Sequence, residues 1–313
     1  MIHSYPLAVF MLFVAMLCWG SWANFQRLAS VSFIRFYINY SIGIFLAALI
    51  ILGIGFYYVP AMMSDSDKFS ALGFALLAGL VWNGGNILLT KAIRLVGMSV
   101  AFPIGIGIAL IEGVITNYIA QPSANVYLLF TGVATIVFAI FIDAYACYLR
   151  DKSKHAAHGS KIGIFYAVIA GLILGWVFRI LMISMTKPEH ISAFSAVPAF
   201  AFGVLLSTLV LGYIYKNKFK NSNERFKAKS FGYSIAAGLV WATGLSCVLF
   251  GSAAAGFAIS DALSQGATMV AALWGVFLWK EFASYKKTWP LLALGFVSYI
   301  LGLGLVIMSH YFS

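Results

Sequence analysis

Runs of apolar residues recur along the whole chain and are separated by short polar stretches. Each run is close to the length of about 20 residues that an α-helix needs to cross a bilayer. The pattern predicts ten membrane spans, at residues 6–25, 36–59, 71–90, 98–119, 126–148, 163–183, 193–215, 231–250, 253–279 and 289–310. The longest polar stretches, 150–161 and 216–229, are too short to form domains. We therefore predict an all-α polytopic membrane protein.

The composition supports this prediction. Of the 313 residues, 62% are hydrophobic and 9% are charged, whereas about 25% of the residues of a soluble domain are charged. A soluble globule cannot hide so much apolar surface, because roughly a quarter of its chain surface stays in contact with water. The composition therefore argues against a soluble enzyme, a disordered tail and a nucleic-acid-binding domain.

The net charge of +11 reflects topology rather than a nucleic-acid partner. Of the 20 Lys and Arg residues, 17 lie in or beside the stretches that follow odd-numbered spans, and the other three are Lys68, Arg179 and Lys187. Basic residues are enriched on the cytoplasmic side of membrane proteins. We therefore predict a multi-pass protein of the plasma (inner) membrane with both termini outside the cytoplasm.

The chain contains an internal repeat. Residues 78–82 (AGLVW) recur as residues 237–241, and glycines match at the same offset of 159 residues: Gly73 with Gly232, Gly85 with Gly244, Gly97 with Gly256, and Gly107 with Gly266. The repeat predicts two halves, 1–150 and 151–313, with five helices each and opposite orientations in the membrane. Inverted repeats of this kind are typical of secondary transporters, whose substrate site lies between the halves. A duplicated membrane protein that transports nothing is the alternative.

Two acidic residues lie deep within predicted spans, where a charge is costly. Glu112 is about 21 Å from the cytoplasmic start of its helix, and Asp261 is about 18 Å above the inner face on a helix of opposite direction. Gln265 and Thr268 share one helical stripe with Asp261. We predict that Asp261 and Glu112 bind and release a coupled proton; the alternative is a carboxyl group that only forms interhelical hydrogen bonds.

Three further charged residues lie near the ends of spans, and their role stays open between function and structure. We expect Asp143 to lie at the membrane interface and Glu281 to pair with its neighbour Lys280. Arg179 either anchors its helix at the interface, balances a buried acid or contacts substrate.

Neutral polar and aromatic side chains gather on other spans. Trp82, Asn83 and Asn86 belong to one predicted helix, and Trp19 and Trp22 lie on one face of another. Amides donate and accept hydrogen bonds without net charge, and indole rings stack on flat ligands or sugar faces. We predict that these five residues, together with Gln265 and Thr268, contact the substrate. Interhelical amide bonds and aromatic belts are the competing interpretation.

The chain has none of the motifs that indicate an enzyme. It has no Gly-Lys of a P-loop, no GxSxG and no HExxH, and Gly105-x-Gly107 is not a dinucleotide fingerprint. The segment 103–107 (PIGIG) is either a hinge in a broken helix or a site of close packing. The three cysteines, Cys18, Cys147 and Cys247, do not indicate a disulfide framework or a metal site. We predict no enzyme activity, no cofactor and no metal.

Several segments resemble the ureide permease family of plants. They are 251–265 (GSAAAGFAISDALSQ), 273–281 (LWGVFLWKE), 284–289 (SYKKTW) and 17–22 (LCWGSW). The stretch from Trp82 to Asn86 and the segment 95–99 (LVGMS) are also similar to rhamnose–proton symporters. These families belong to the glucose, ribose and ureide branch of the drug/metabolite transporter superfamily, and the similarity covers nearly the whole chain.

The resemblance implies a drug/metabolite transporter fold of five plus five helices and proton-coupled uptake of a small polar solute. Asp261 matches the acid of the ureide-permease segment. The plant proteins carry a long loop with a Walker-type motif where this chain has only the short stretch 150–161, so the resemblance implies no use of ATP. We expect a ureide, nucleobase or related oxo-heterocycle as substrate. A sugar such as ribose, glucose or rhamnose is the alternative, followed by export of metabolites, and a membrane receptor or scaffold comes last. The expected partners are the solute, a proton and the lipid bilayer, with a monomer or homodimer as the assembly.

Overall fold

The computed structural model describes residues 4–58, 68–152, 161–186, 188, 190–214 and 227–312. Within these residues all regular structure is helical: α1 (Tyr5–Ala29), α2 (Phe33–Tyr58), α3 (Phe69–Val96), α4 (Met98–Ala120), α5 (Val126–Lys152), α6 (Lys161–Thr186), α7 (Ala193–Ile214), α9 (Ala228–Ala255), α10 (Phe257–Ser264), α11 (Ala267–Leu273), a π-helical turn (Trp274–Leu278), a 3₁₀ turn (Lys286–Thr288) and α12 (Trp289–Met308). Nine of the described helices are long and apolar enough to cross a membrane. The chain is therefore a multi-pass membrane protein, as the hydrophobic pattern predicts.

The prediction of one continuous helix over 253–279 is wrong. Gly256 ends α9 with a φ of +79°, a conformation that costs little only for glycine. The chain then forms α10, a two-residue interruption at Gln265 and Gly266, α11 and the π-helical turn. Broken helices in membrane proteins occur where the backbone is buried in protein or lines a cavity, and all eight residues of α10 are buried.

The alternative of a hinge at 103–107 is also wrong, because α4 runs without a break from Met98 to Ala120 and contains Pro103. Gly105 serves close packing instead. A methyl group on Gly171 of α6 would press against the carbonyl oxygen of Gly105, so small residues let α4 and α6 approach each other.

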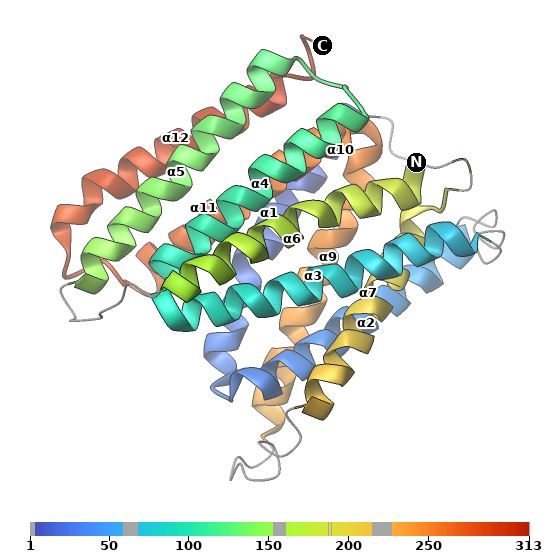
Figure 1. Ribbon diagram of the computed structural model, residues 1–313, viewed down its shortest axis with the longest axis horizontal. Coiled ribbons are helices and arrows are strands. Elements are labelled where there is room, and N and C mark those ends of the chain that lie inside the picture. Colours follow the sequence, from blue (N-terminus) through green and yellow to red (C-terminus); the bar gives the residue numbers. More distant parts are fainter. Residues whose placement is uncertain are drawn as a thin grey trace.

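Helices from the two halves of the chain pack side by side. Helix α1 runs along α9, α3 runs along α6, and α2 and α7 lie between them against α9 and α3. Helices α5 and α12 form a separate pair at one edge of the bundle, and both ends of the chain lie at the same end of the molecule (Figure 1). We call the opposite end the basic end, since it carries Arg27, Arg94, Arg150, Lys161 and Lys227.

Two of these packing contacts correspond residue by residue. A Cβ on Gly79 of α3 would collide with the carbonyl oxygen of Phe200 in α7, and a Cβ on Gly238 of α9 would collide with the carbonyl oxygen of Tyr40 in α2. Gly79 and Gly238 are separated by the repeat offset of 159 residues. The inverted repeat stays a prediction, and this matched pair of contacts supports it.

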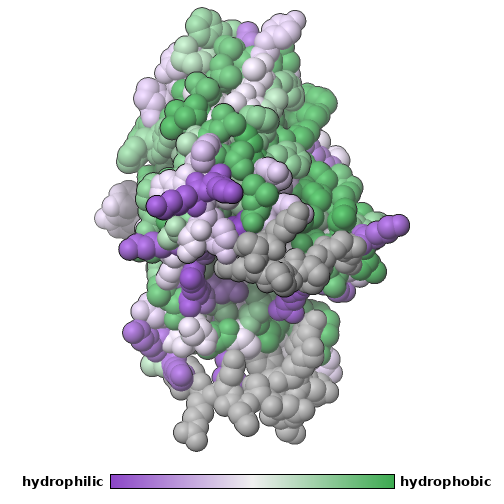
Figure 2. All heavy atoms as spheres, turned by 90° about the vertical axis from the view of Figure 1, so that its left-hand side faces the viewer, coloured by the Kyte–Doolittle hydropathy of each residue, from purple (hydrophilic) through white to green (hydrophobic). Residues whose placement is uncertain are grey.

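The surface is that of a protein in contact with lipid. Large apolar side chains are exposed along α2, α5, α7 and α12, for example Ile50, Phe138, Leu209 and Ile300, whose exposed fractions are 60%, 53%, 59% and 63%. Figure 2 shows that hydrophobic residues cover much of one side of the molecule, with hydrophilic residues gathered around its middle and lower part.

Candidate functional site

Four aromatic rings from four helices meet in the interior. Trp241 of α9 lies at the centre, with its ring centroid 4.4 Å from that of Trp82, 5.6 Å from that of Trp19 and 5.9 Å from that of Phe200. The indole N–H of Trp19 donates to the carbonyl oxygen of Trp241 at 3.0 Å. Trp82, Phe200 and Trp241 lie 13 or 14 residues from the basic ends of their helices, or about 20 Å, which is near the middle of the membrane. We call these four residues the aromatic cluster.

A network of amides and hydroxyls adjoins this cluster between α2, α3 and α7. The hydroxyl of Tyr37 donates to Oδ1 of Asn83, and Nδ2 of Asn86 donates to the Tyr37 hydroxyl at 3.0 Å. Nδ2 of Asn83 donates to Ser207 at 2.7 Å and to Thr208 at 3.2 Å. Asn83 is fully buried. These five residues, the amide network, place several uncharged hydrogen-bonding groups beside an aromatic surface.

The acid Asp261 lies in a second site, on α10. Its side chain is buried, with 2% exposed, and its carboxylate rests on Gly113 of α4, where a Cβ would collide with it. The amides of Gln265 and Asn117 lie beside the carboxylate. Asn117 is fully buried, and neither its side-chain nitrogen nor its side-chain oxygen has a hydrogen-bond partner among the described residues. All of the contacts described here between this carboxylate and its surroundings are with uncharged groups.

Glu112 lies next to this acid site. It precedes Gly113 in α4, and its own carboxylate packs against Gly175 of α6. Both acids therefore lie near Gly113 of α4, with the carboxylate of Asp261 against this glycine and the carboxylate of Glu112 directed at α6. The aromatic cluster reaches toward this region through Trp19. The ring centroid of Trp19 is 6.3 Å from that of Phe178, and Phe178 lies one turn after Gly175 in α6.

A profile of the family described as "Sugar transport protein" matches residues 8–309. The chain belongs to this family. The glucose uptake protein GlcU of Bacillus subtilis is 26% identical over 79% of this chain and 80% of its own length. Ureide permease 5 of Arabidopsis thaliana is 21% identical over 96% of this chain and 94% of its own length. One crystal structure superposes with a TM-score of 0.71 at 12% identity and covers 99% of this chain and 100% of that chain, so the two share a fold. This member of the sugar transport family is a transporter of small solutes.

The fold of this transporter joins some predicted site residues and separates others. Trp19 and Trp82 belong to the aromatic cluster, and Asn83 and Asn86 belong to the amide network. Trp22 lies outside both groups and stacks on Tyr40, with ring centroids 5.0 Å apart. Gln265 and Thr268 lie in the acid region. Thr268 donates either to the carbonyl of Gln265 at 2.7 Å or to the hydroxyl of Tyr299 at 2.9 Å.

Sequence analysis missed several residues that line these two regions: Asn117, Phe200, Ser207, Thr208, Trp241 and Tyr299. One of them had a usable pattern, because Trp241 is the repeat counterpart of Trp82. The others are single polar or aromatic residues in apolar helices, and nothing in a helical stripe indicates which neighbour such a side chain will meet.

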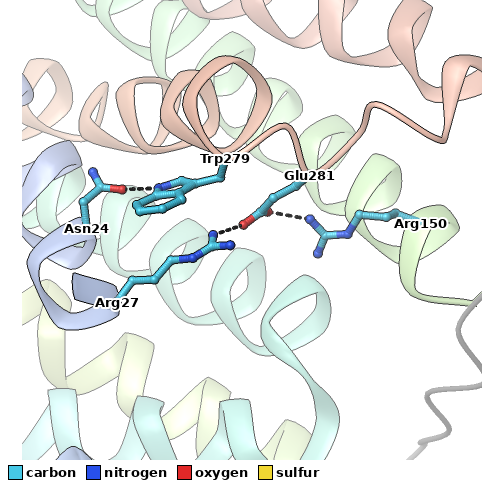
Figure 3. Close-up of polar contacts among 5 residues, drawn as sticks. All are labelled: Asn24, Arg27, Arg150, Trp279 and Glu281. Atoms are coloured by element: carbon cyan, nitrogen blue, oxygen red, sulfur yellow. Dashed lines mark hydrogen bonds and ion pairs between the residues drawn. The ribbon is translucent and has the colours of Figure 1, made fainter. Parts of the chain in front are cut away.

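The predicted environments of two acids are wrong. Asp143 does not lie at the interface: both of its carboxylate oxygens are buried, and they pack against Gly295 of α12. Glu281 does not pair with Lys280. It accepts from Arg27 of α1 at 2.9 Å and from Arg150 of α5 at 2.7 Å (Figure 3).

The residues around Glu281 form what we call the basic-end bridge. Its members are Asn24, Arg27, Arg150, Trp279 and Glu281 (Figure 3). The indole of Trp279 donates to Asn24 at 2.6 Å, and the Arg27 guanidinium lies 4.0 Å from the centroid of the Trp279 ring. The bridge ties the segment before α12 to both α1 and α5, and it borders a surface pocket of about 460 Å³.

Two further expectations concern single residues. Arg179 contacts the sulfur of Met182 in its own helix at 3.3 Å, and its contact with substrate stays a prediction. The three cysteines are free. No group of three or more His, Cys, Asp or Glu side chains in the described ranges could hold a metal ion.

Proposed function

We propose that the chain is a proton-coupled uptake transporter for a sugar. The observation that carries this proposal is the amide network beside the aromatic cluster near mid-membrane. Sugars present apolar C–H faces that stack on aromatic rings, and hydroxyls that exchange hydrogen bonds with amides. The name of the glucose uptake relative supports the same substrate class.

A ureide or nucleobase is the second candidate, favoured by similarity to Ureide permease 5 over 96% of the chain. A flat heterocycle is best held in a slot between two parallel rings. Trp82 and Trp241 instead touch each other, with ring planes inclined by 43°. The contact of these rings and the number of amides and hydroxyls beside them favour a sugar.

Alternating access explains how a solute reaches this interior. In the described conformation the groups of the amide network bind one another, so a solute must replace these bonds as α2, α3 and α7 separate. The basic-end bridge joins α1 to α5 through Glu281, and it closes the route to the interior from the basic end. We place the basic end in the cytoplasm and both termini outside the plasma membrane, by the positive-inside rule.

The coupled proton is carried by Asp261 or Glu112. Burial among neutral groups favours Asp261, because a carboxylate without a cation nearby is costly in the membrane and gains from taking up a proton. Protonation removes the formal charge of Asp261, so it changes the relative energy of conformations that bury or expose this side chain.

The substrate assignment is tested by ligand-dependent thermal stabilisation of the purified protein. A compound that binds only the native state raises the melting temperature. We expect D-glucose or another sugar of a panel to raise it, and Asn86→Ala to weaken sugar binding about tenfold by removing one hydrogen bond of the network. Asn125→Ala, which truncates an amide at the opposite end of the molecule, is the control and keeps wild-type affinity. Stabilisation by allantoin or uracil alone would select the second candidate, and by aromatic cations alone would contradict uptake of either.

The basic-end bridge leads to a separate prediction. Glu281→Gln removes both ion pairs and should favour opening at the basic end about three- to tenfold, since each partly exposed pair contributes up to about 1 kcal/mol. The measurement is the rate at which a membrane-impermeant maleimide labels Ser207→Cys in inside-out vesicles, in a variant lacking the three native cysteines. Lys280→Gln changes an exposed neighbouring charge and should leave the rate unchanged. Equal rates in the two variants would show that the bridge does not hold this end closed.

A further inference from the structure

Asp143 is a buried acid for which the proposed cycle has no role. We propose that Asp143 is a second carboxyl group that takes up and releases a proton during transport, with the Tyr299 hydroxyl beside it and at a place separate from the substrate site. This inference rests on the proton coupling proposed above and adds a second proton to it.

The surroundings of Asp143 are buried and mainly apolar, and they favour the uncharged form of its carboxyl group. Both oxygens are buried, and Gly295 of α12 leaves the space that one of them occupies, since a Cβ there would collide with it. Residues around this point are mainly apolar and include Ala146, Val276 and Leu292. Burying an acid inside a membrane protein is costly, and this cost makes Asp143 a candidate for a functional role.

The titratable and charged groups around Asp143 come from α12, from α5, from the segment with Glu281 and from the 3₁₀ turn. On α12 the Tyr299 hydroxyl lies beside the carboxylate. On α5 itself, Cys147 is one turn away and Arg150 two turns away, and Arg150 binds Glu281. The 3₁₀ turn contributes Lys286 and Lys287, which are exposed at the surface. The hydroxyl beside the carboxylate is neutral, and neither carboxylate oxygen has a hydrogen-bond partner among the described residues.

A series of polar groups, which includes the backbone carbonyl of Gln265, lies between this carboxyl group and the acid site. The Tyr299 hydroxyl is 2.9 Å from that of Thr268, which lies 2.7 Å from the carbonyl of Gln265, and the Gln265 amide lies beside Asp261. Asp261 rests on Gly113, 15 residues from the start of α4, and Asp143 is nine residues from the end of α5. At 1.5 Å per residue these are about 23 Å and about 14 Å from the basic end.

The two carboxyl groups thus lie at different depths, with this series of polar groups between them. Each carboxyl group takes up one proton from the water on one side of the membrane and releases it to the water on the other side after the conformational change, while Tyr299 keeps its own proton. The aromatic cluster and the amide network contribute none of these groups. Substrate contacts and the second proton are therefore separable by mutation.

Proton stoichiometry tests the inference. In proteoliposomes with a pH gradient of one unit and no membrane potential, a symporter of two protons accumulates D-glucose about 100-fold, and a symporter of one proton about tenfold. We expect about 100-fold for the wild type and about tenfold for Asp143→Asn, with D-glucose exchange unchanged. Asp143→Glu, which keeps the carboxyl group, should restore two protons with a shifted pH profile.

The possible outcomes separate this inference from the proposed function. Accumulation of about tenfold by the wild type, or of about 100-fold by Asp143→Asn, would overturn the role of Asp143 and leave proton-coupled uptake intact. No accumulation of D-glucose by the wild type under the gradient would overturn both. If Asp143→Asn fails to fold, Asp143→Glu and Tyr299→Phe take its place, and wild-type pH profiles in both would overturn the inference.

Discussion

Asp261→Asn lowers the accumulation of substrate at least tenfold, while exchange of labelled for unlabelled substrate continues. Asparagine has nearly the shape of a protonated aspartate, so α10 keeps its contact with Gly113, but the side chain can no longer release a proton. Without this proton the carrier still moves bound solute across the membrane, but it draws less energy from the proton gradient, because only the proton proposed for Asp143 remains. The measurement compares pH-driven accumulation with exchange in the same proteoliposomes.

Neighbouring substitutions sharpen this test. Ser260→Ala removes a fully buried hydroxyl next to Asp261 and should retain accumulation, since it removes no titratable group. Asp261→Glu adds a methylene group against the backbone of α4 and should also impair accumulation. Full accumulation in Asp261→Asn together with its loss in Glu112→Gln would assign the proton to Glu112 instead.

Gly238→Leu prevents the helices from closing around the substrate site. A Cβ at Gly238 already collides with the backbone of α2 at Tyr40, Gly43 and Ile44, and backbone cannot move aside as a flexible side chain can. Overpacking of this kind costs about 3 kcal/mol or more, which corresponds to a fall in melting temperature of about 10 °C. Trp241 lies one turn further along α9, so D-glucose binding should fall with stability.

The matched control for this substitution lies on the same helix. Gly232 is six residues earlier in α9, and a Cβ there meets nothing within 4 Å. Gly232→Leu should keep or slightly raise the melting temperature, because leucine favours a helix over glycine by up to about 1 kcal/mol. Similar losses in both variants would mean that glycine flexibility in α9, rather than close packing on α2, is what the protein requires.

The membrane spans could be predicted from the sequence because they depend on the length of each apolar run. The broken ninth span could not, because its apolar run continues through Gln265 and Gly266. Its first break follows from the positive φ of Gly256. Gly97 has the same conformation at the corresponding junction between α3 and α4, and the repeat alone placed both glycines at equivalent positions.

The site was predicted in part. Costly acids and clustered amides are visible in the sequence, and they make Asp261, Glu112, Asn83 and Asn86 candidates. The partners of these groups were not, because Ser207 and Asn117 are ordinary residues of apolar helices until another helix brings a polar group to them.

The sequence by itself determined that this is a helical membrane protein, which end of each helix carries the basic residues, and which side chains are too polar for their surroundings. These properties depend on local composition and on the energy of transfer into lipid. Only the tertiary structure decided that Asp143 is buried against α12, that Glu281 joins α1 to α5, and that Trp241 lies at the centre of the aromatic cluster. Those contacts depend on which helix faces come together, and in lipid that choice is made by close packing at residues such as Gly79 and Gly238 rather than by hydrophobicity.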